Sequence, residues 1–288
     1  MEQLSYLNPD LIVNFLKQAL EEDIGPGDYS TLAAIDKDAQ GKASVLIKDS
    51  GVLAGVEVAK QVFEIVDHAL EVTCFLEDGA RVQAGDIAFS ISGMVRSILS
   101  TERLVLNIMQ RMSGVATKTH KMVSIIEGTG VKLLDTRKTT PNFRAFEKWA
   151  VKIGGGENHR FALYDMIMLK DNHIDYAGGI SIAVAKTKEY LNSNNLDLKI
   201  EVETRTMAEV EEALNSDIDI ILLDNMSPEE LREAVLLVGK RCATEASGGI
   251  NEQNIALIAA TGVDYISVGA LTHSYKSLDM SLKATIDK

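Results

Sequence analysis

The sequence predicts an α/β protein with two domains, and three observations point to this fold class. The chain has 288 residues, which exceeds the commonest length of a single domain. Up to about residue 112, short β-type runs alternate with glycine-containing turns, which is typical of an α+β domain with a mostly antiparallel sheet. Beyond residue 112, strand-like apolar runs alternate with helical stretches, which is typical of parallel strands joined by crossover helices.

The first domain is predicted to begin with a helix. Asn8 is followed by Pro9 and by apolar residues at helical spacing, so we expect Asn8 to be the N-cap. Three strands are expected over residues 43–47, 70–75 and 86–91. A helix is expected over residues 56–66, and a long helix with an apolar stripe is expected to begin near Ser100 and to join the two domains.

The second domain is predicted to contain six strands that alternate with helices. The candidate strands cover residues 131–134, 166–169, 199–202, 218–223, 242–246 and 265–268. Such units can close into a barrel or form an open, doubly wound sheet. Every candidate strand ends in a polar or glycine-containing segment. All strand ends meet at one mouth in a barrel, whereas only those near one switch point meet in an open sheet, so the polar ends favour an α/β barrel.

The overall charge excludes several classes of function. The chain carries 42 acidic and 29 basic side chains, a formal net charge of −13, which argues against binding to nucleic acid or to an anionic membrane. No apolar run approaches the roughly 20 residues of a membrane-spanning helix, and the N-terminus lacks the pattern of a signal peptide. Cys74 and Cys242 are far apart in sequence and are expected to be reduced thiols in a cytoplasmic protein.

Basic residues gather in two short stretches of this acidic chain. Arg137 and Lys138 follow the first predicted strand of the barrel, and His159, Arg160 and Lys170 come shortly after. A single arginine or lysine at a strand end is more often a solvated charge, but the group favours a binding site. Guanidinium and ammonium groups match carboxylate and phosphate oxygens, so we expect a small anion with several charges as the ligand.

Two carboxylates form a second candidate set. Glu203 and Asp224 each follow an apolar strand-like run, and a carboxylate placed there needs a partner. They can neutralise the basic residues, or they can hold Mg²⁺ and sugar hydroxyls next to a phosphorylated substrate. Glu201, two residues before Glu203, is predicted to point to the other side of the strand.

A glycine-containing turn provides a third candidate set. Ser247, Gly248 and Gly249 precede a predicted helix, and Gly269 follows the next strand. The last two turns of an α/β barrel often bind phosphate through backbone amides, although Ser-Gly-Gly alone is usually just a turn. The histidines lack a zinc-binding spacing, and no G-x-S-x-G motif indicates a serine hydrolase.

Nine motifs occur in one order along the chain. They are TERLVLN at 101–107, QRMSG at 110–114, DTRKTTP at 135–141, GGGENHR at 154–160, LKDNHI at 169–174, EVE at 201–203, LLDN at 222–225, EASGGI at 245–250 and VGALTHS at 268–274. Together with EDIGPGD at 22–28, this set resembles the family of nicotinate-nucleotide pyrophosphorylase (carboxylating), also called quinolinate phosphoribosyltransferase.

The resemblance implies a fold and a reaction. The fold has an N-terminal sandwich domain, residues 1–112 joined by 274–288, and an open α/β barrel that forms the catalytic domain, residues 113–273. The reaction is transfer of phosphoribose from phosphoribosyl pyrophosphate to quinolinate, with decarboxylation, to give nicotinate mononucleotide, pyrophosphate and carbon dioxide. Mg²⁺ is the implied cofactor, and the implied assembly is a homodimer.

The resemblance also implies roles for individual residues. Arg103 would reach into the site of the partner subunit. Arg137, His159 and Arg160 would bind the carboxylates of quinolinate, with Lys170 close by. The other implied roles are phosphate binding by Lys138 and Lys170, ribose and metal binding by Glu203 and Asp224, and binding of the 5′-phosphate by Ser247, Gly248, Gly249, Gly269 and His273. Lys138, Lys170, Glu203 and Asp224 are the implied catalytic set.

Two alternatives stay open on the sequence. One is a related phosphoribosyltransferase that acts on another aromatic acid. The other is a barrel without catalytic activity that senses phosphorylated ligands, although Glu203 and Asp224 beside the basic residues argue against it.

Overall fold

The structure is a computed structural model that describes residues 7–285, and these residues form two compact units. The first unit contains the described residues up to His120, then Thr139–Gly155, and those from Ser274 onward. The second contains Lys121–Lys138 and Gly156–His273. The sequence analysis placed residues 139–155 in the barrel domain. Here they are grouped with the first unit, where the Phe15 ring lies 5.0 Å from that of Phe146.

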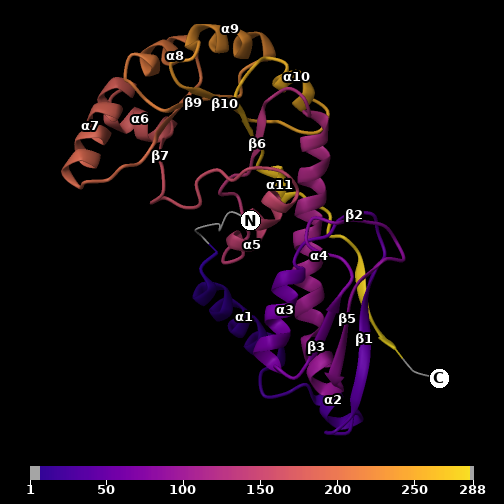
Figure 1. Ribbon diagram of the computed structural model, residues 1–288. Coiled ribbons are helices and arrows are strands. Elements are labelled where there is room, and N and C mark those ends of the chain that lie inside the picture. The colour runs from indigo at the N-terminus through magenta and orange to yellow at the C-terminus, as the bar shows by residue number, and fades with distance from the viewer. Residues whose placement is uncertain (1–6, 286–288) are drawn as a thin grey trace. The chain divides into compact units, whose positions relative to one another are not determined.

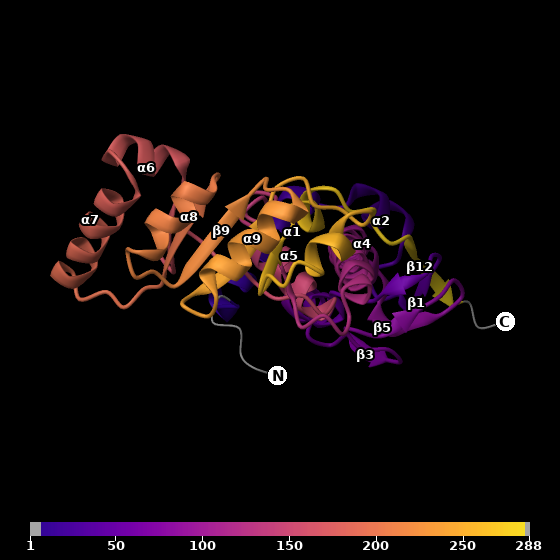
Figure 2. The same cartoon turned by 90° about the horizontal axis from the view of Figure 1, so that it is seen from above.

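The first unit is built on an antiparallel sheet whose strand order is β12-β1-β5-β3 (Figure 2). Its strands are β1 (Gln40–Ile47), β3 (Glu71–Cys74), β5 (Ile87–Met94) and β12 (Met280–Thr285), and β2 (Gly51–Val52) pairs with β4 (Arg81–Val82). Its helices are α1 (Pro9–Ile24), α2 (Tyr29–Ala34), α3 (Val56–Val66), α5 (Arg144–Ile153) and most of α4 (Val95–Ile125). The predicted antiparallel sheet is confirmed.

Local sequence signals set the bounds of the helices in this unit. Asn8 accepts a hydrogen bond from the backbone N–H of Asp10 at 2.9 Å, so α1 begins at Pro9 as predicted. α3 occupies the predicted residues 56–66, and Asp78 accepts a hydrogen bond from the Val56 N–H at its start. Phe63 of α3 packs edge-on against Phe89 of β5, with 5.8 Å between ring centroids, which ties the helix to the sheet.

The edge strand β12 comes from the far end of the sequence. It pairs with β1 from Lys42 opposite Thr285 to Ile47 opposite Met280. Figure 1 shows this yellow C-terminal strand beside β1. The segment before it passes close to α4, where Gly114 leaves room for the backbone of Lys276. The C-terminal segment is therefore built into the first sheet.

The second unit is an α/β barrel with one opening. Its strands are β6 (Lys132–Leu134), β7 (Ile167–Leu169), β8 (Ile200–Thr204), β9 (Ile220–Asp224), β10 (Ala243–Ser247) and β11 (Tyr265–Ser267), all parallel in the order β6-β11-β10-β9-β8-β7. Consecutive strands from β7 to β11 thus pair with each other, β11 pairs with β6, and the ring stays open between β6 and β7. A doubly wound sheet would reverse its order at a switch point, so the predicted α/β fold with an open barrel is confirmed.

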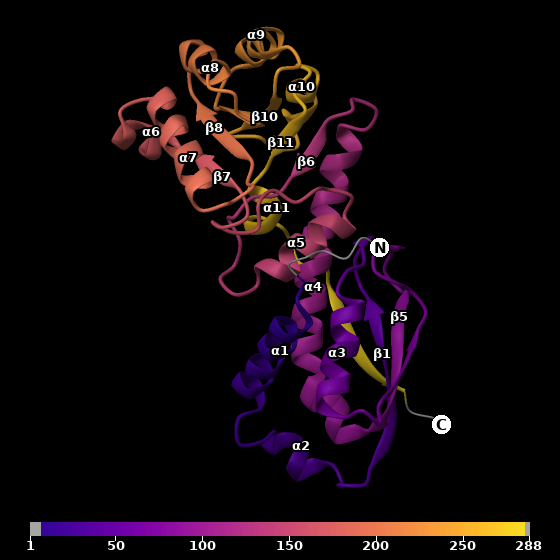
Figure 3. The ribbon, with the colours of Figure 1, turned by 60° about the vertical axis from the view of Figure 1, so that its left-hand side comes forward.

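Helices connect the successive strands of the barrel from β7 to β11. They are α6 (Asp171–Ala177), α7 (Ile180–Ser193), α8 (Met207–Leu214), α9 (Pro228–Val238) and α10 (Ile255–Ala259), and the short α11 (Ala270–His273) follows β11. α7 to α10 lie outside the row of strands in Figure 3, so the carboxyl ends of the strands face a common space. Within residues 7–285, no helix is long and apolar enough to cross a membrane.

The close approach of α4 to the C-terminal segment gives a stability prediction. In Gly114→Ala the new methyl would overlap the carbonyl oxygen of Lys276 and lie 2.9 Å from Cδ2 of Tyr275. We expect a loss of about 1–3 kcal/mol in the free energy of unfolding, because overpacking outweighs the gain in helix propensity. Asn107→Ala, at an exposed position of the same helix, is the control, and equal urea midpoints for the two variants would contradict the prediction.

Candidate active site

A pocket of about 280 Å³ lies where the strands of the barrel end. This volume is close to the lower end of the roughly 300–1,000 Å³ of small-molecule sites, so it suits a small ligand. Its lining is Thr136, Arg137, Lys138, His159, Arg160, Met168, Lys170, Leu222, Glu245, Ser247 and Ser267. The structure thus brings together residues that lie in or shortly after five different strands, including all the basic residues predicted for the barrel site except His273.

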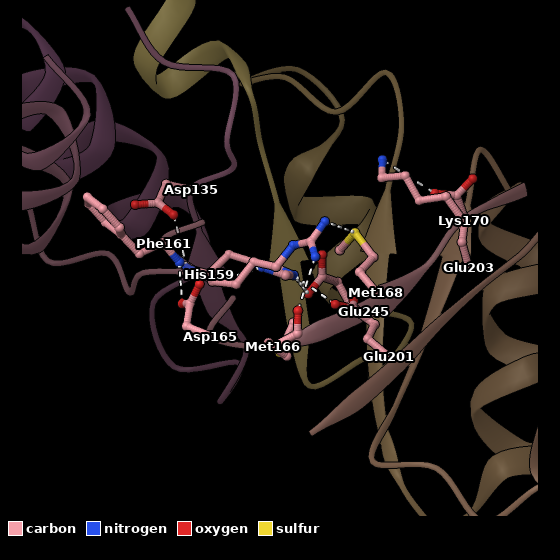
Figure 4. Close-up of polar contacts among 11 residues, drawn as sticks. Asp135, His159, Phe161, Asp165, Met166, Met168, Lys170, Glu201, Glu203 and Glu245 are labelled. Carbon is pink, nitrogen blue, oxygen red and sulfur yellow. Dashed lines mark hydrogen bonds and ion pairs between the residues drawn. The ribbon is translucent and has the colours of Figure 1, made fainter. Parts of the chain in front are cut away.

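Asp135 fixes one wall of the pocket. This residue follows β6 and is fully buried. Its carboxylate accepts hydrogen bonds from the backbone N–H of His159 at 3.0 Å and from Nδ2 of Asn158 at 2.6 Å. Figure 4 shows the contact with His159. Asp135 therefore holds the segment that carries His159 and Arg160 beside the strand that carries Arg137.

Arg160 is held by contacts with Met166, just before β7, and with Met168 in β7. Its guanidinium donates to the carbonyl oxygen of Met166 at 3.1 Å and lies 3.6 Å from Sδ of Met168. Burial and the charge of Arg137 both lower the pKa of Arg160. The two guanidinium groups therefore lie close enough to repel each other, and a ligand with negative charge would relieve that repulsion.

Lys138 lies against the last turn of the barrel. Its carbonyl oxygen accepts a hydrogen bond from Oγ1 of Thr272 at 2.8 Å. A Cβ atom at Gly269 would lie 2.9 Å from Cδ of Lys138 and 3.2 Å from Nε2 of His273. Only a residue without a side chain leaves this space, so Gly269 allows Lys138 and His273 to lie close together.

Glu203 and Lys170 form an ion pair at the ends of β8 and β7. The two charged atoms are 3.6 Å apart, and half of the lysine side chain is exposed. Burial raises the pKa of Glu203, the charge of Lys170 lowers it, and the charge of Asp224 raises it. Such a partly exposed pair contributes little to stability, roughly 0–1 kcal/mol, so Lys170 stays available to an anion. One of the two roles that the sequence left open for Glu203, neutralising a basic residue, is therefore observed in its ion pair with Lys170.

Asn225 connects Asp224 with the glycine turn after β10. Its side chain donates to Oδ2 of Asp224 at 2.7 Å, and its N–H donates to the carbonyl oxygen of Ser247 at 2.9 Å. Gly248 has a φ of +95° and lies directly against the Asn225 side chain. Both conditions require glycine at this position.

Glu201 and Glu245 are functional candidates that the sequence analysis missed. Both side chains are buried around Nε2 of His159, at distances of 3.0 Å and 3.5 Å (Figure 4). The three residues could also be metal ligands, since their ligand atoms all lie within 4.8 Å of one another. Burial lowers the pKa of His159, but the hydrogen bonds and charges of the two glutamates raise it to about 10.

The prediction that Glu201 points away from Glu203 was wrong. Residues two positions apart in a strand share a face. Glu201 lies farther from the carboxyl end of β8 and contacts His159, whereas Glu203 lies near that end and contacts Lys170. The spacing in the EVE motif was the signal that could have identified it.

The remaining predicted residues lie in or near these strand ends, with one exception. Gly249 follows Gly248 in the turn after β10, and Asp224 is the last residue of β9. Arg103 is the exception, because it lies exposed on α4 in the part assigned to the first unit.

Comparison with known proteins gives the family of this chain. Family models described as the N-terminal and C-terminal domains of quinolinate phosphoribosyl transferase match residues 28–113 and 115–283. The chain belongs to the quinolinate phosphoribosyltransferase family. These matches cover both units of the fold.

Individual members of the family match nearly the whole chain. Quinolinate phosphoribosyltransferase [decarboxylating] 1b of Nicotiana tabacum is 44% identical over 93% of this chain and 81% of its own length. The probable nicotinate-nucleotide pyrophosphorylase [carboxylating] of Bacillus subtilis is 40% identical over 92% and 90%. The crystal structure of NadC from Streptococcus pyogenes has a TM-score of 0.92 at 44% identity and covers 97% and 99% of the two chains.

The turn after β10, which contains Gly248 and Gly249, gives a stability prediction. In Gly248→Ala the new methyl would overlap Oδ1 of Asn225 and lie 2.9 Å from its backbone nitrogen. We expect a loss of about 2–4 kcal/mol in the free energy of unfolding, since strain at positive φ adds to this overlap.

Gly249→Ala is the matched control for this variant. Gly249 also has positive φ, but no atom lies within 4 Å of its added methyl. Gly249→Ala is therefore expected to lower the free energy of unfolding by about 1–2 kcal/mol, because only backbone strain is added. Urea unfolding measures the free energy of unfolding of each variant. An equal decrease in Gly248→Ala and Gly249→Ala would show that the contact with Asn225 has no effect.

Proposed function

We propose that this chain transfers phosphoribose from phosphoribosyl pyrophosphate to quinolinate and releases carbon dioxide, with nicotinate mononucleotide and pyrophosphate as the other products. This is the reaction of NAD biosynthesis that its family performs. One observation carries the proposal: a chain of net charge −13 collects Arg137, Lys138, Arg160 and Lys170 in a single small pocket. The names of the relatives support quinolinate as the acceptor over another aromatic acid.

Arg137, His159 and Arg160 are proposed to bind the two carboxylates of quinolinate. Arg137 and Arg160 lie close enough for their charges to interact, and both line the pocket. Planar guanidinium groups can bind carboxylates through two parallel hydrogen bonds, which fixes the orientation of a planar ring as well as its position. Lys170, which directly follows β7, also lines the pocket and would lie close to the substrate.

The phosphoribosyl group is proposed to lie toward β8 to β11. Glu203 and Asp224 would bind the ribose hydroxyls, and Lys138 with Lys170 would bind phosphate. The turn of Ser247, Gly248 and Gly249, with Gly269 and His273, would surround the 5′-phosphate. The positive φ of Gly248 and Gly249 and the lack of a side chain at Gly269 support a close approach of backbone to ligand there.

Mg²⁺ is the proposed cofactor, and its proposed ligands are Glu203 and Asp224. The donor set fits the ion, because two carboxylates close enough to raise the pKa of Glu203 by mutual repulsion offer the oxygen ligands that Mg²⁺ prefers. When bound, the ion would neutralise charge that develops on the pyrophosphate leaving group.

The residues of the chain contribute mainly by orientation and charge. Both substrates are anions that repel each other, and the basic pocket holds them so that the ring nitrogen faces the anomeric carbon. Lys138 and Lys170 stabilise the negative charge on departing pyrophosphate. The pyridinium nitrogen formed by the transfer then stabilises the electron pair left at C2 when the 2-carboxylate departs, so decarboxylation needs no further cofactor.

The proposed assembly is a homodimer in which Arg103 enters the site of the partner subunit. Its exposed position on α4 supports this role, because an exposed arginine is free to meet another chain. A cytoplasmic location stays a prediction from the sequence.

A direct assay tests the proposed reaction. Purified protein given phosphoribosyl pyrophosphate and quinolinate labelled in the 2-carboxylate should release labelled carbon dioxide and form nicotinate mononucleotide. Nicotinate in place of quinolinate should give no carbon dioxide, and EDTA should reduce the rate at least tenfold because the proposed metal is removed. Failure to form the mononucleotide from quinolinate would exclude the proposed function.

Arg137 provides a test of how quinolinate is bound. Arg137→Ala should raise the KM for quinolinate about 10- to 100-fold, since loss of a charge-assisted pair typically costs about 1.5–3 kcal/mol. The KM for phosphoribosyl pyrophosphate should change far less. Arg232→Ala, which removes an exposed arginine paired with Glu229 on α9, is the control. Unchanged quinolinate KM in a folded Arg137→Ala protein would exclude this role.

A further inference from the structure

Two buried carboxylates lie at the basic pocket, whose lining includes Glu245, and the proposed reaction assigns them no substrate. Glu201 of β8 is fully buried, and Glu245 of β10 has 1% of its side chain exposed. Carboxylates are almost never buried so deeply without a partner. Their oxygens lie 3.0 Å and 3.5 Å from the same atom, Nε2 of His159.

The imidazole of His159 is held at both of its nitrogens. The backbone N–H of Arg160 donates to Nδ1 at 2.7 Å, on the side of the ring away from the glutamates. The orientation of the ring is therefore linked to the peptide that carries Arg160. The Arg160 side chain, in turn, is fixed by Met166, just before β7, and by Met168 of β7.

The two ends of the ring favour different protonation states. The glutamates favour an imidazolium and raise the pKa of His159 to about 10, whereas a donor at Nδ1 favours a neutral ring with its proton on Nε2. Nε2 carries a proton in both states. In either state the Nε2–H therefore faces the carboxylates of the two glutamates.

We propose that Glu201 and Glu245 are positioning residues that hold the Nε2–H of His159 and thereby fix the imidazole and the adjoining Arg160 peptide in the geometry that receives quinolinate. This inference rests on the proposed function, in which His159 and Arg160 bind the substrate. Neither glutamate needs to touch the substrate for this role.

A metal ion is the competing occupant of this cluster. The three side chains offer ligand atoms within 4.8 Å of one another, as a metal site would. However, the 3.0 Å between Nε2 and a carboxylate oxygen of Glu201 is also the distance of a charge-assisted ion pair, which needs no metal. The positive charge of Arg160 acts on Glu201 as well, and it would repel a cation.

The charged groups around His159 come from several elements. Glu201 and Glu245 face Nε2, Asp135 accepts from the backbone N–H of His159, and Arg160 follows it in sequence. Arg137 and Asp165 act on the charge of Arg160. Among these, the two glutamates are the groups that meet the ring at Nε2.

Nitrogen-15 NMR of histidine tests the proposal without relying on activity. The chain has five histidines, and a His159→Gln sample identifies the signals of His159. In the wild type, Nε2 should stay protonated from pH 6 to pH 9, and its proton should exchange slowly with water. Exposed His68 supplies a reference for fast exchange.

The decisive variant is Glu201→Gln with Glu245→Gln, in which amides of nearly equal volume replace both carboxylates. We expect exchange of the Nε2 proton to become at least tenfold faster, and the quinolinate KM to rise about tenfold, because charge-assisted hydrogen bonds are lost. The KM for phosphoribosyl pyrophosphate should stay within about twofold. If the double variant does not fold, Glu245→Gln alone should show both effects at a smaller size.

Asp219→Asn is the matched control. Its carboxylate accepts a hydrogen bond from the Ile200 N–H at 2.7 Å, at the opposite end of β8 from the pocket. Asp219→Asn should leave the His159 signals unchanged, and also the ratio of the KM for quinolinate to the KM for phosphoribosyl pyrophosphate. Unchanged exchange and unchanged quinolinate KM in the folded glutamine variants would overturn the proposal, as would one equivalent of Zn²⁺ shifting the His159 nitrogens of the wild type.

The two proposals can fail separately. If the wild type does not convert quinolinate, the proposed function fails. The exchange measurement still decides whether the glutamates hold the ring.

Discussion

The barrel of this protein has to hold like charges together in a small space. One pocket collects the cationic side chains of Arg137, Lys138, Arg160 and Lys170. Arg137 and Arg160 repel each other, since the charge of Arg137 adds to burial in lowering the pKa of Arg160. Glu201 and Glu245 supply opposite charge next to His159, and Glu203 supplies it next to Lys170. The basic residues that would bind an anion are therefore also the residues whose charges these carboxylates offset.

The two ends of the barrel strands have different tasks. At the amino ends, Asp219 and Asp264 accept backbone hydrogen bonds from Ile200 and Thr244, which tie neighbouring strands together. At the carboxyl ends, acidic and basic side chains face the pocket. Because all six strands are parallel, each strand contributes its first residues to structure and its last residues to the site. Asp135 combines both tasks, since it is buried and also holds the His159 segment.

Local patterns in the sequence predicted the elements well, and contacts between distant elements less well. The cap at Asn8, the helix over 56–66 and the polar strand ends follow from spacing and residue type alone. The packing of Phe143 and Phe146 on Phe15 does not, because no periodicity links positions more than 120 residues apart. Glu201 was missed for a different reason: the two-residue spacing in the EVE motif places it on the same face as Glu203, and there it meets His159.

The pairing of β12 with β1 has a consequence for the order of events during synthesis. A ribosome releases residues 280–285 long after it has released residues 40–47, so the N-terminal sheet lacks an edge strand while the barrel sequence is being made. The barrel segments, by contrast, have all their strand partners between residues 132 and 267. The part of the chain that is translated first therefore completes its sheet last. Until then, β1 exposes an unpaired edge to other nascent chains.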